Sequence, residues 1–140
     1  MRYLAIDYGT KRVGMGLSDE SGAMGFPHAT LPNSGRLIDE ILALITQKNV
    51  GAVVLGESRG FDGSPNPVAQ AAKEFGALIE RRTGITVAYE PETLTTQEAR
   101  RNFEGVRESG SGSVLVDASA AALILTSYLD RNRPHGERKD

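Results

Sequence analysis

The sequence predicts an α/β protein in which one mixed five-stranded sheet carries helices on both faces. Three short strand-like segments joined by turns open the chain, and this pattern indicates an antiparallel meander. Apolar strand segments then alternate with amphipathic helical segments, as in βα units whose right-handed crossovers return parallel strands to the same sheet. The length of 140 residues suits one core, so we expect a single domain over residues 1–140.

The meander occupies the first part of the chain. Apolar residues alternate along a first strand, which ends at a turn with a basic rim over residues 9–12. The alternation resumes at Val13 in a second strand and reaches a third strand over residues 23–31. Pro27 has no backbone N–H to give to a sheet, and we therefore expect the third strand to lie at an edge.

Helices and strands then alternate through the middle of the chain. We expect a helix that ends near Lys48, a buried strand over residues 51–56, a helix from Pro67 to about Thr83 and a fifth strand over residues 85–90. The strand over residues 51–56 is apolar without alternation, which is typical of a parallel strand covered on both faces.

The last third of the chain is predicted to be helical with one interruption. A capping box at residues 95–98 starts a helix that ends near Glu104. The Gly/Ser-rich segment 105–113 is typical of a loop, and a final helix is expected over residues 114–131. The polar segment 132–140 is expected to be a disordered tail.

The composition excludes several classes of function. The chain has no cysteine, which rules out disulfides, thiolate metal sites and cysteine nucleophiles. The net charge of −2 gives no overall attraction for nucleic acid, and the absence of tryptophan argues against a base-stacking platform. No apolar run is long enough to span a membrane and the chain opens directly on a strand, so we expect no signal peptide, no membrane partner and a cytoplasmic location.

Acidic residues fall at the carboxyl ends of the predicted strands, where ligands bind in open α/β sheets. Asp7 ends the first strand, Glu57 follows the buried strand, and Glu90 and Glu92 come at the end of the fifth. The alternative for Asp7 is a residue that caps its own turn, and a lone Glu57 or Glu92 is better explained as an ordinary loop acid. Their convergence at one edge favours a functional site.

Asp117 is the fourth acidic candidate, and small residues follow it over 118–122. Small side chains allow a helix to approach a sheet closely, which would bring Asp117 towards Asp7. The alternative is an aspartate in the first helical turn, stabilised by the helix dipole. Independently, Gly14 and Gly16 lie on one face of the second strand, where other backbone or a ligand can approach.

A group of carboxylates without cysteine suits Mg²⁺ or Mn²⁺. Two such ions about 3.5–4 Å apart can activate a water and stabilise the leaving oxygen in phosphodiester cleavage. His28 and His135 lie far from the acids in the chain, which argues against a zinc site. Basic side chains could hold the phosphate backbone, although each is by default a solvated surface charge: Lys11, Arg12, Arg59, Arg100 and Arg101.

Four parts of the chain resemble the motifs of the YqgF (RuvX) family, whose members are described as Holliday junction resolvases and pre-16S rRNA nucleases. They are IDYGTKRVG at 6–14 with SD at 18–19, DGS at 62–64 with QA at 70–71, LTTQEA at 94–99, and VDASAA at 116–121 with IL at 124–125 and YL at 128–129. The resemblance covers nearly the whole chain. It implies an RNase H-like fold, with a mixed five-stranded sheet flanked by helices, and divalent-metal hydrolysis of phosphodiester bonds.

The chain departs from the family pattern at three places. The family usually has Asp-Glu-Arg before Leu-Thr-Thr, whereas residues 91–93 here are Pro-Glu-Thr. The lysines often found before the last aspartate are replaced by glycine and serine over residues 110–113. Glu57 replaces the leucine of the usual Gly-Leu-Pro, and in the wider group of RNase H-like nucleases a second carboxylate ends the fourth strand.

These features together give a ligand set and a range of functions. We expect Asp7, Glu57 and Asp117 to hold the metal, with Glu92 as a further or substitute ligand. The expected activity is an endonuclease on structured nucleic acid, either for 5′-end processing of pre-16S rRNA, for Holliday junction resolution or for both. A resolvase would be expected to act as a homodimer, because a four-way junction has two equivalent strands to cut.

Two other functions remain open from the sequence. The loss of basic residues favours a weakened homologue that binds nucleic acid without efficient cleavage. The segment Asp-Tyr-Gly-Thr also resembles the phosphate hairpin of actin-like ATPases and sugar kinases, which would make the chain a nucleotide-binding domain. Those enzymes close two such domains around a nucleotide, whereas 140 residues supply one.

Overall fold

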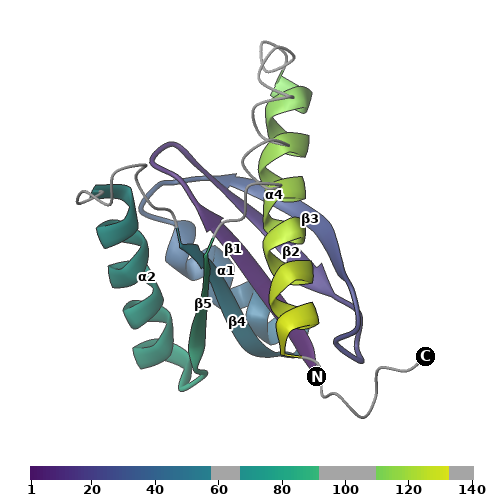
Figure 1. Cartoon of the computed structure of the whole chain (residues 1–140). Helices are drawn as coiled ribbons and strands as arrows, with labels where there is room; N and C mark the ends of the chain where they lie inside the picture. The colour runs from purple at the N-terminus through teal and green to yellow at the C-terminus, as the bar shows by residue number, and fades with distance from the viewer. Residues whose placement is uncertain (58–66, 92–109, 133–140) are drawn as a thin grey trace.

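The structure is a computed structural model that describes residues 1–57, 67–91 and 110–132. Its strands form one five-stranded sheet in the order β3-β2-β1-β4-β5. Their bounds are β1 Arg2–Tyr8, β2 Arg12–Ser18, β3 Gly25–Pro32, β4 Val50–Glu57 and β5 Val87–Pro91. The first three pair antiparallel, while β4 runs parallel to β1 and β5 parallel to β4. The predicted mixed sheet is confirmed (Figure 1).

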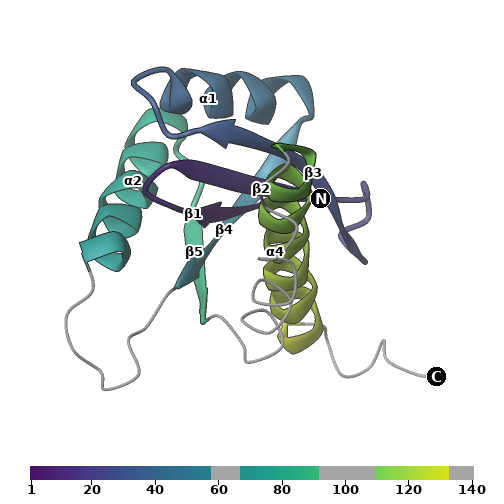
Figure 2. The same ribbon diagram turned by 90° about the horizontal axis from the view of Figure 1, so that it is seen from above.

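Helices cover both faces of the sheet, as Figures 1 and 2 show together. The helices α1 (Leu37–Gln47) and α2 (Pro67–Thr83) lie on one face, and α4 (Gly110–Arg131) crosses the other. Alternation along β1 accounts for this division. Ile6 belongs to the core beneath α1 and α2, whereas its neighbour Ala5 belongs to the core beneath α4.

The two cores differ in the size of their side chains. The core beneath α1 and α2 contains large apolar residues from both the sheet and the helices, among them Leu4, Met15, Leu37, Ile41, Leu55 and Ile79. The core beneath α4 is small, with buried Val54, Ile124, Leu125 and Leu129 around Ala5. A sheet face that offers few large side chains allows α4 to lie unusually near the strands.

The third strand begins at Gly25 rather than at residue 23, because Asp19 holds the preceding turn. The Oδ1 atom of Asp19 accepts hydrogen bonds from the backbone N–H groups of Ala23 (2.8 Å) and Met24 (2.9 Å). Its Oδ2 atom accepts one from the Ser21 hydroxyl. The Ser21 hydrogen bond, followed by those from the backbone, holds the pKa of Asp19 well below its usual range.

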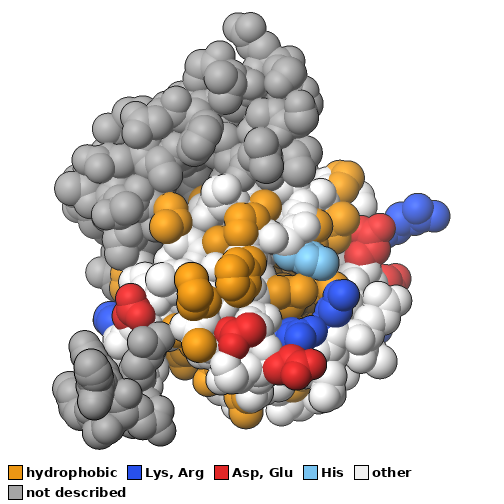
Figure 3. Space-filling view, turned by 90° about the vertical axis from the view of Figure 1, so that its right-hand side faces the viewer, with side chains coloured by type: hydrophobic (Ala, Val, Ile, Leu, Met, Phe, Trp, Pro, Cys, Tyr) orange, Lys and Arg blue, Asp and Glu red, His pale blue; other side chains and the backbone are white. Residues whose placement is uncertain are grey.

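β3 forms one edge of the sheet, as Pro27 predicted. Large apolar side chains are exposed on and just before this strand: Phe26 is 48% exposed and Met24 is 56% exposed. Figure 3, which views the side of the molecule where β3 lies, shows hydrophobic side chains gathered there.

The last helix begins at Gly110 rather than at residue 114, so the loop expected over residues 105–113 is wrong at its C-terminal end. Glycine and serine have low helix propensity, but propensity is a weak preference that continuation of a long packed helix overrides. The helix expected to start at residue 95 lies outside the described residues. Within the described ranges, no helix is both long and apolar enough to cross a membrane.

Candidate active site

Asp7 and Asp117 are neighbours on the face of the sheet that α4 covers. Asp7 is the register partner of Gly14 across β1 and β2. Asp117 lies directly over this glycine, because a Cβ built on Gly14 would be 3.0 Å from the Cβ of Asp117. The Cβ positions of register partners in an antiparallel pair are about 4.5–5.5 Å apart, so this is the separation between the Cβ of Asp7 and the Gly14 position that Asp117 covers. Asp7 and Asp117 are therefore within reach of a common ligand. Both aspartates are buried, each with 8% exposure.

The close approach of α4 has a cause in both elements. A Cβ at Gly16 would lie 3.0 Å from the backbone nitrogen of Ala122, and one at Gly56 would lie 2.5 Å from Cδ1 of Ile124. On the helix side, the buried residues after Asp117 are mainly alanines: Ala118, Ala120, Ala121 and Ala122. The structure therefore places Asp117 beside Asp7, as the small residues predicted.

Arg12 completes this group in a way that the sequence did not indicate. Its Nε atom donates to Oδ2 of Asp117 over 2.6 Å, and the two residues are 105 positions apart. The turn that carries Arg12 is anchored by Asn33, whose side-chain amide donates to the Gly9 carbonyl over 2.7 Å. Arg12 was predicted to hold substrate phosphate; in this structure it holds one of the proposed metal ligands.

Glu57 lies on the opposite face of the sheet from Asp7, which corrects the expectation that these two share a metal. Successive residues of a strand point to opposite faces. Glu57 shares a face of the sheet with Leu55, two positions earlier, which packs beneath α1 and α2. Asp7 shares the other face with Ala5, which packs beneath α4. Tyr89 packs in the core beneath α1 and α2, and its pKa is raised chiefly by burial and also by the charge of Glu57. The charge of Glu57 is therefore felt by a residue of its own face of the sheet.

Glu90 is the glutamate that shares the Asp7 face. It is the register partner of Gly56 and is only 2% exposed. Its Oε2 atom accepts a hydrogen bond from the Ser127 hydroxyl and its Oε1 atom accepts one from Nη2 of Arg131, both over 2.8 Å. This carboxylate therefore fixes the end of α4 to β5. The sequence signal for it is the spacing of Ser127 and Arg131, which places both on one helix face.

The remaining predicted site residues are distributed differently. Lys11 is exposed on the turn between β1 and β2. Glu92, Arg59, Arg100 and Arg101 lie outside the described residues. Across residues 1–57, 67–91 and 110–132, no three acidic or histidine side chains form a group that could hold a metal.

A pair of buried carboxylates is nevertheless a fitting donor set for one Mg²⁺ or Mn²⁺ ion. Magnesium is usually held by one or two protein carboxylates and keeps several waters or substrate phosphate oxygens. Asp7 and Asp117 supply oxygen donors from a rigid strand and a rigid helix, and the guanidinium of Arg12 already places a cation against one of them. Asp7 and Asp117 are therefore the described residues that would hold the ion.

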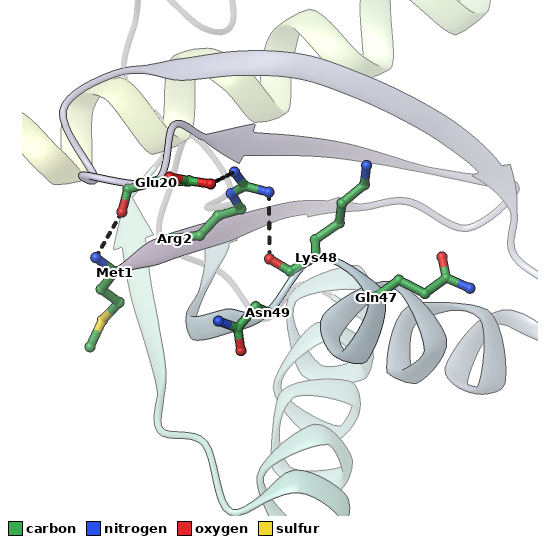
Figure 4. Close-up of a pocket in the computed structure, with 6 residues that line it drawn as sticks. All are labelled: Met1, Arg2, Glu20, Gln47, Lys48 and Asn49. Atoms are coloured by element: carbon green, nitrogen blue, oxygen red, sulfur yellow. Dashed lines mark hydrogen bonds and ion pairs between the residues drawn. The ribbon is translucent and has the colours of Figure 1, made fainter.

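A separate pocket of about 500 Å³ lies at the other end of β1 (Figure 4). Arg2 is its central residue: Nη1 donates to the Lys48 carbonyl over 3.5 Å, Nη2 lies 3.7 Å from Glu20, and the buried Nε has no hydrogen-bond partner. At about 3.4 Å per strand residue, Arg2 is about 17 Å from Asp7, so the pocket is not part of the carboxylate site. Glu20 and the C-terminal end of α1 both oppose an anion there.

Among the solved structures that share this fold are Holliday junction resolvases. The chain superposes on Thermus thermophilus RuvC in complex with a Holliday junction substrate with a TM-score of 0.61, at 18% identity, over 94% of this chain and 95% of RuvC. The fowlpox virus resolvase in complex with Holliday junction DNA gives a TM-score of 0.60, at 15% identity, over 96% and 100% of the two chains. The fold is thus that of the RuvC-like, RNase H-like resolvases.

The chain itself belongs to the RuvX family, described as Holliday junction resolvases, whose family model matches residues 1–131. A relative from Nitratidesulfovibrio vulgaris is 35% identical over 141 residues, which cover 99% of this chain and 98% of the relative. A relative from Lachnospira eligens is 35% identical over 137 residues, which cover 93% and 97%. Both carry the provisional name pre-16S rRNA nuclease, and the family resemblance of the sequence motifs is confirmed.

Proposed function

We propose that the protein is a divalent-metal-dependent endonuclease that hydrolyses phosphodiester bonds in structured nucleic acid, with Asp7 and Asp117 as its metal ligands. One observation carries this proposal: two buried aspartates lie beside each other at Gly14, at the carboxyl end of β1. Membership of a nuclease family supports the same conclusion. Burial of two neighbouring acids is costly for stability unless a cation compensates them, which is expected of a binding site.

The bound Mg²⁺ or Mn²⁺ would supply a polarised phosphate and an activated water. The protein's own residues position this chemistry. The sheet fixes Asp7, the helix α4 fixes Asp117, and Lys11, which is exposed on the adjoining turn, would attract the phosphate backbone. Glu92, which lies outside the described residues, is proposed as a further or substitute ligand because it stands just before the motif at 94–99, where the family usually has a glutamate.

The substrate is proposed to be precursor 16S rRNA, cut near its 5′ end, with a four-way DNA junction as the second substrate to be tested. The rRNA assignment follows the provisional names of relatives that are 35% identical over nearly their whole length. The junction assignment follows the description of the family. Activity on a junction would require a homodimer that presents two sites, and we propose this state only for that substrate.

The test is cleavage of a labelled 5′-extended 16S precursor and of a labelled four-way junction by the intact protein with Mg²⁺, with Mn²⁺ and with EDTA. We expect cleavage with either metal, no cleavage with EDTA, and a loss of at least about 100-fold in Asp7→Asn and Asp117→Asn. Glu20→Gln serves as the control, because it neutralises an exposed acid at the far pocket. Equal cleavage by Asp7→Asn and the native protein would contradict the proposal.

A nucleic-acid-binding protein with weakened catalysis is the second candidate. The specific observation in its favour is the Arg12–Asp117 ion pair, which occupies one of the two proposed metal ligands. This candidate predicts binding of the same RNA or junction with no metal-dependent cleavage.

A further inference from the structure

Arg12 and Asp117 form the shortest ion pair among the residues that the structure describes, with Nε and Oδ2 2.6 Å apart. The Asp117 side chain is 11% exposed and that of Arg12 is 35% exposed. A carboxylate this buried needs a partner of opposite charge, and the guanidinium provides one. The partner itself remains accessible to solvent, so it can leave without being drawn through the core.

The backbone around Arg12 is held in place by hydrogen bonds that do not involve the Arg12 side chain. Asn33 binds both sides of the turn: its side-chain amide donates to the Gly9 carbonyl over 2.7 Å, and its backbone N–H donates to the Lys11 carbonyl over 2.9 Å. Arg12 itself then begins β2. A change of partner for the guanidinium therefore requires rotation of the side chain only.

A guanidinium and a divalent cation compete for the same carboxylate. Two cations in a buried site repel each other strongly, because the local dielectric constant is far below that of water. A metal ion on Asp117 would therefore drive the Arg12 side chain away. A loaded nuclease site also contains the substrate phosphate, and the fork of a guanidinium binds phosphate as well as it binds carboxylate.

We propose that Arg12 is a built-in counter-ion of Asp117, which a divalent metal displaces and which then binds the substrate phosphate. Rotation of this one side chain couples the two events: metal loading frees Arg12 for nucleic acid, and nucleic acid that captures Arg12 raises the affinity of the site for metal. The two effects are equal in size, since coupling between binding sites is reciprocal. The proposal rests on the proposed metal site and adds to it an order of assembly.

The first test is calorimetric titration of the intact protein with Mn²⁺ in the absence of nucleic acid. Arg12→Gln removes the counter-ion, and Lys11→Gln is the matched control because it removes the same charge from the adjacent, exposed position of the same turn. We expect Arg12→Gln to bind Mn²⁺ roughly 10- to 100-fold more tightly than Lys11→Gln, the range that corresponds to a hydrogen bond between charged groups. Equal or weaker binding by Arg12→Gln would overturn the proposal, and weaker binding would make Arg12 a residue that orients Asp117 for the metal.

Asp117→Asn separates failure of this inference from failure of the proposed function. If Asp117→Asn abolishes Mn²⁺ binding while Arg12→Gln matches Lys11→Gln, the metal site stands and the counter-ion role is wrong. If the native protein and all three variants fail to bind Mn²⁺, both proposals are wrong.

The second test follows the Arg12 Nε–H group directly by NMR in the native protein and needs a variant only to assign the signal. With EDTA, we expect a resolved Nε–H signal that exchanges slowly with water because it is bonded to Asp117, assigned by its absence in Arg12→Lys. Addition of Mg²⁺ should shift the signal and accelerate its exchange, and a phosphate-containing oligonucleotide should restore protection. A signal that Mg²⁺ leaves unchanged at saturation would overturn displacement.

Discussion

The carbonyl oxygen of Asp117 lies 2.1 Å from the position that a Cβ of Gly14 would occupy. No side chain can be accommodated at this distance, so the proximity of the two aspartates depends on a glycine in the middle of β2. Asp7 is the register partner of this glycine. Gly14 therefore leaves the room for the site and determines how close Asp117 lies to Asp7.

Gly14→Ala is expected to lower the free energy of unfolding by about 1–3 kcal/mol, because the added methyl group forces α4 away from the sheet. Urea unfolding measures this change, and Mn²⁺ affinity should fall together with it. Gly35→Ala is the control, since nothing lies within 4 Å of a Cβ at that position. A Gly14→Ala protein as stable as Gly35→Ala would show that α4 does not lie this close in solution.

Arg131→Gln should destabilise the protein by about 1–3 kcal/mol, because the buried Glu90 then keeps only its hydrogen bond from Ser127. Thermal or urea unfolding gives the measurement. The matched control is Arg81→Gln, which removes the same charge from the last turn of α2. If both variants lose the same stability, the effect belongs to the helix dipole and not to the contact with Glu90.

The ligand set is tested by Mn²⁺ affinity in single variants. Asp7→Asn should bind Mn²⁺ at least about tenfold more weakly than the native protein, because it removes a charged ligand. Glu57→Gln should bind it as the native protein does, since Glu57 lies across the sheet from Asp7. Glu92→Gln should weaken binding if this residue is the third ligand. Loss of affinity in Glu57→Gln would contradict the assignment of Glu57 and Asp7 to opposite faces of the sheet.

His28 should make stability depend on pH. The His28 side chain is largely exposed on β3, and its partial desolvation, with a smaller contribution from the positive charge of Lys48, lowers its pKa below 6.5. The folded protein then binds fewer protons than the unfolded chain, so the His28 contribution is complete above pH 6.5 and decreases as the pH falls towards the folded pKa. Between about pH 7.5 and about pH 5.5, the urea midpoint should decrease more in the native protein than in His28→Gln. Identical decreases would assign the effect to other groups.

The fold could be predicted from the sequence because each of its signals is local. Alternation in the meander, the continuous apolar strand over residues 51–56 and the edge position of Pro27 all correspond to the structure. Boundaries were less accurate where side chains decide them, as at the Asp19 turn, whose hydrogen bonds delay the start of β3.

The site was predicted only in part, for two physical reasons. Glu57 follows a strand that is apolar on both faces, so the sequence shows the edge at which it lies but not the face. The Arg12–Asp117 contact joins residues 105 positions apart, and no local pattern in either segment records it. Asp7 and Asp117 could be proposed from the sequence because a strand end and a stretch of small helical residues are both local sequence patterns.

α4 lies on a sheet face of mainly small residues, and besides its apolar contacts it forms two ion pairs, between Asp117 and Arg12 and between Arg131 and Glu90. These ion pairs are about 21 Å apart along the helix axis. Because both ion pairs hold the same rigid helix, the contact between Arg131 and Glu90 helps to keep Asp117 in position while the Arg12 side chain changes its partner.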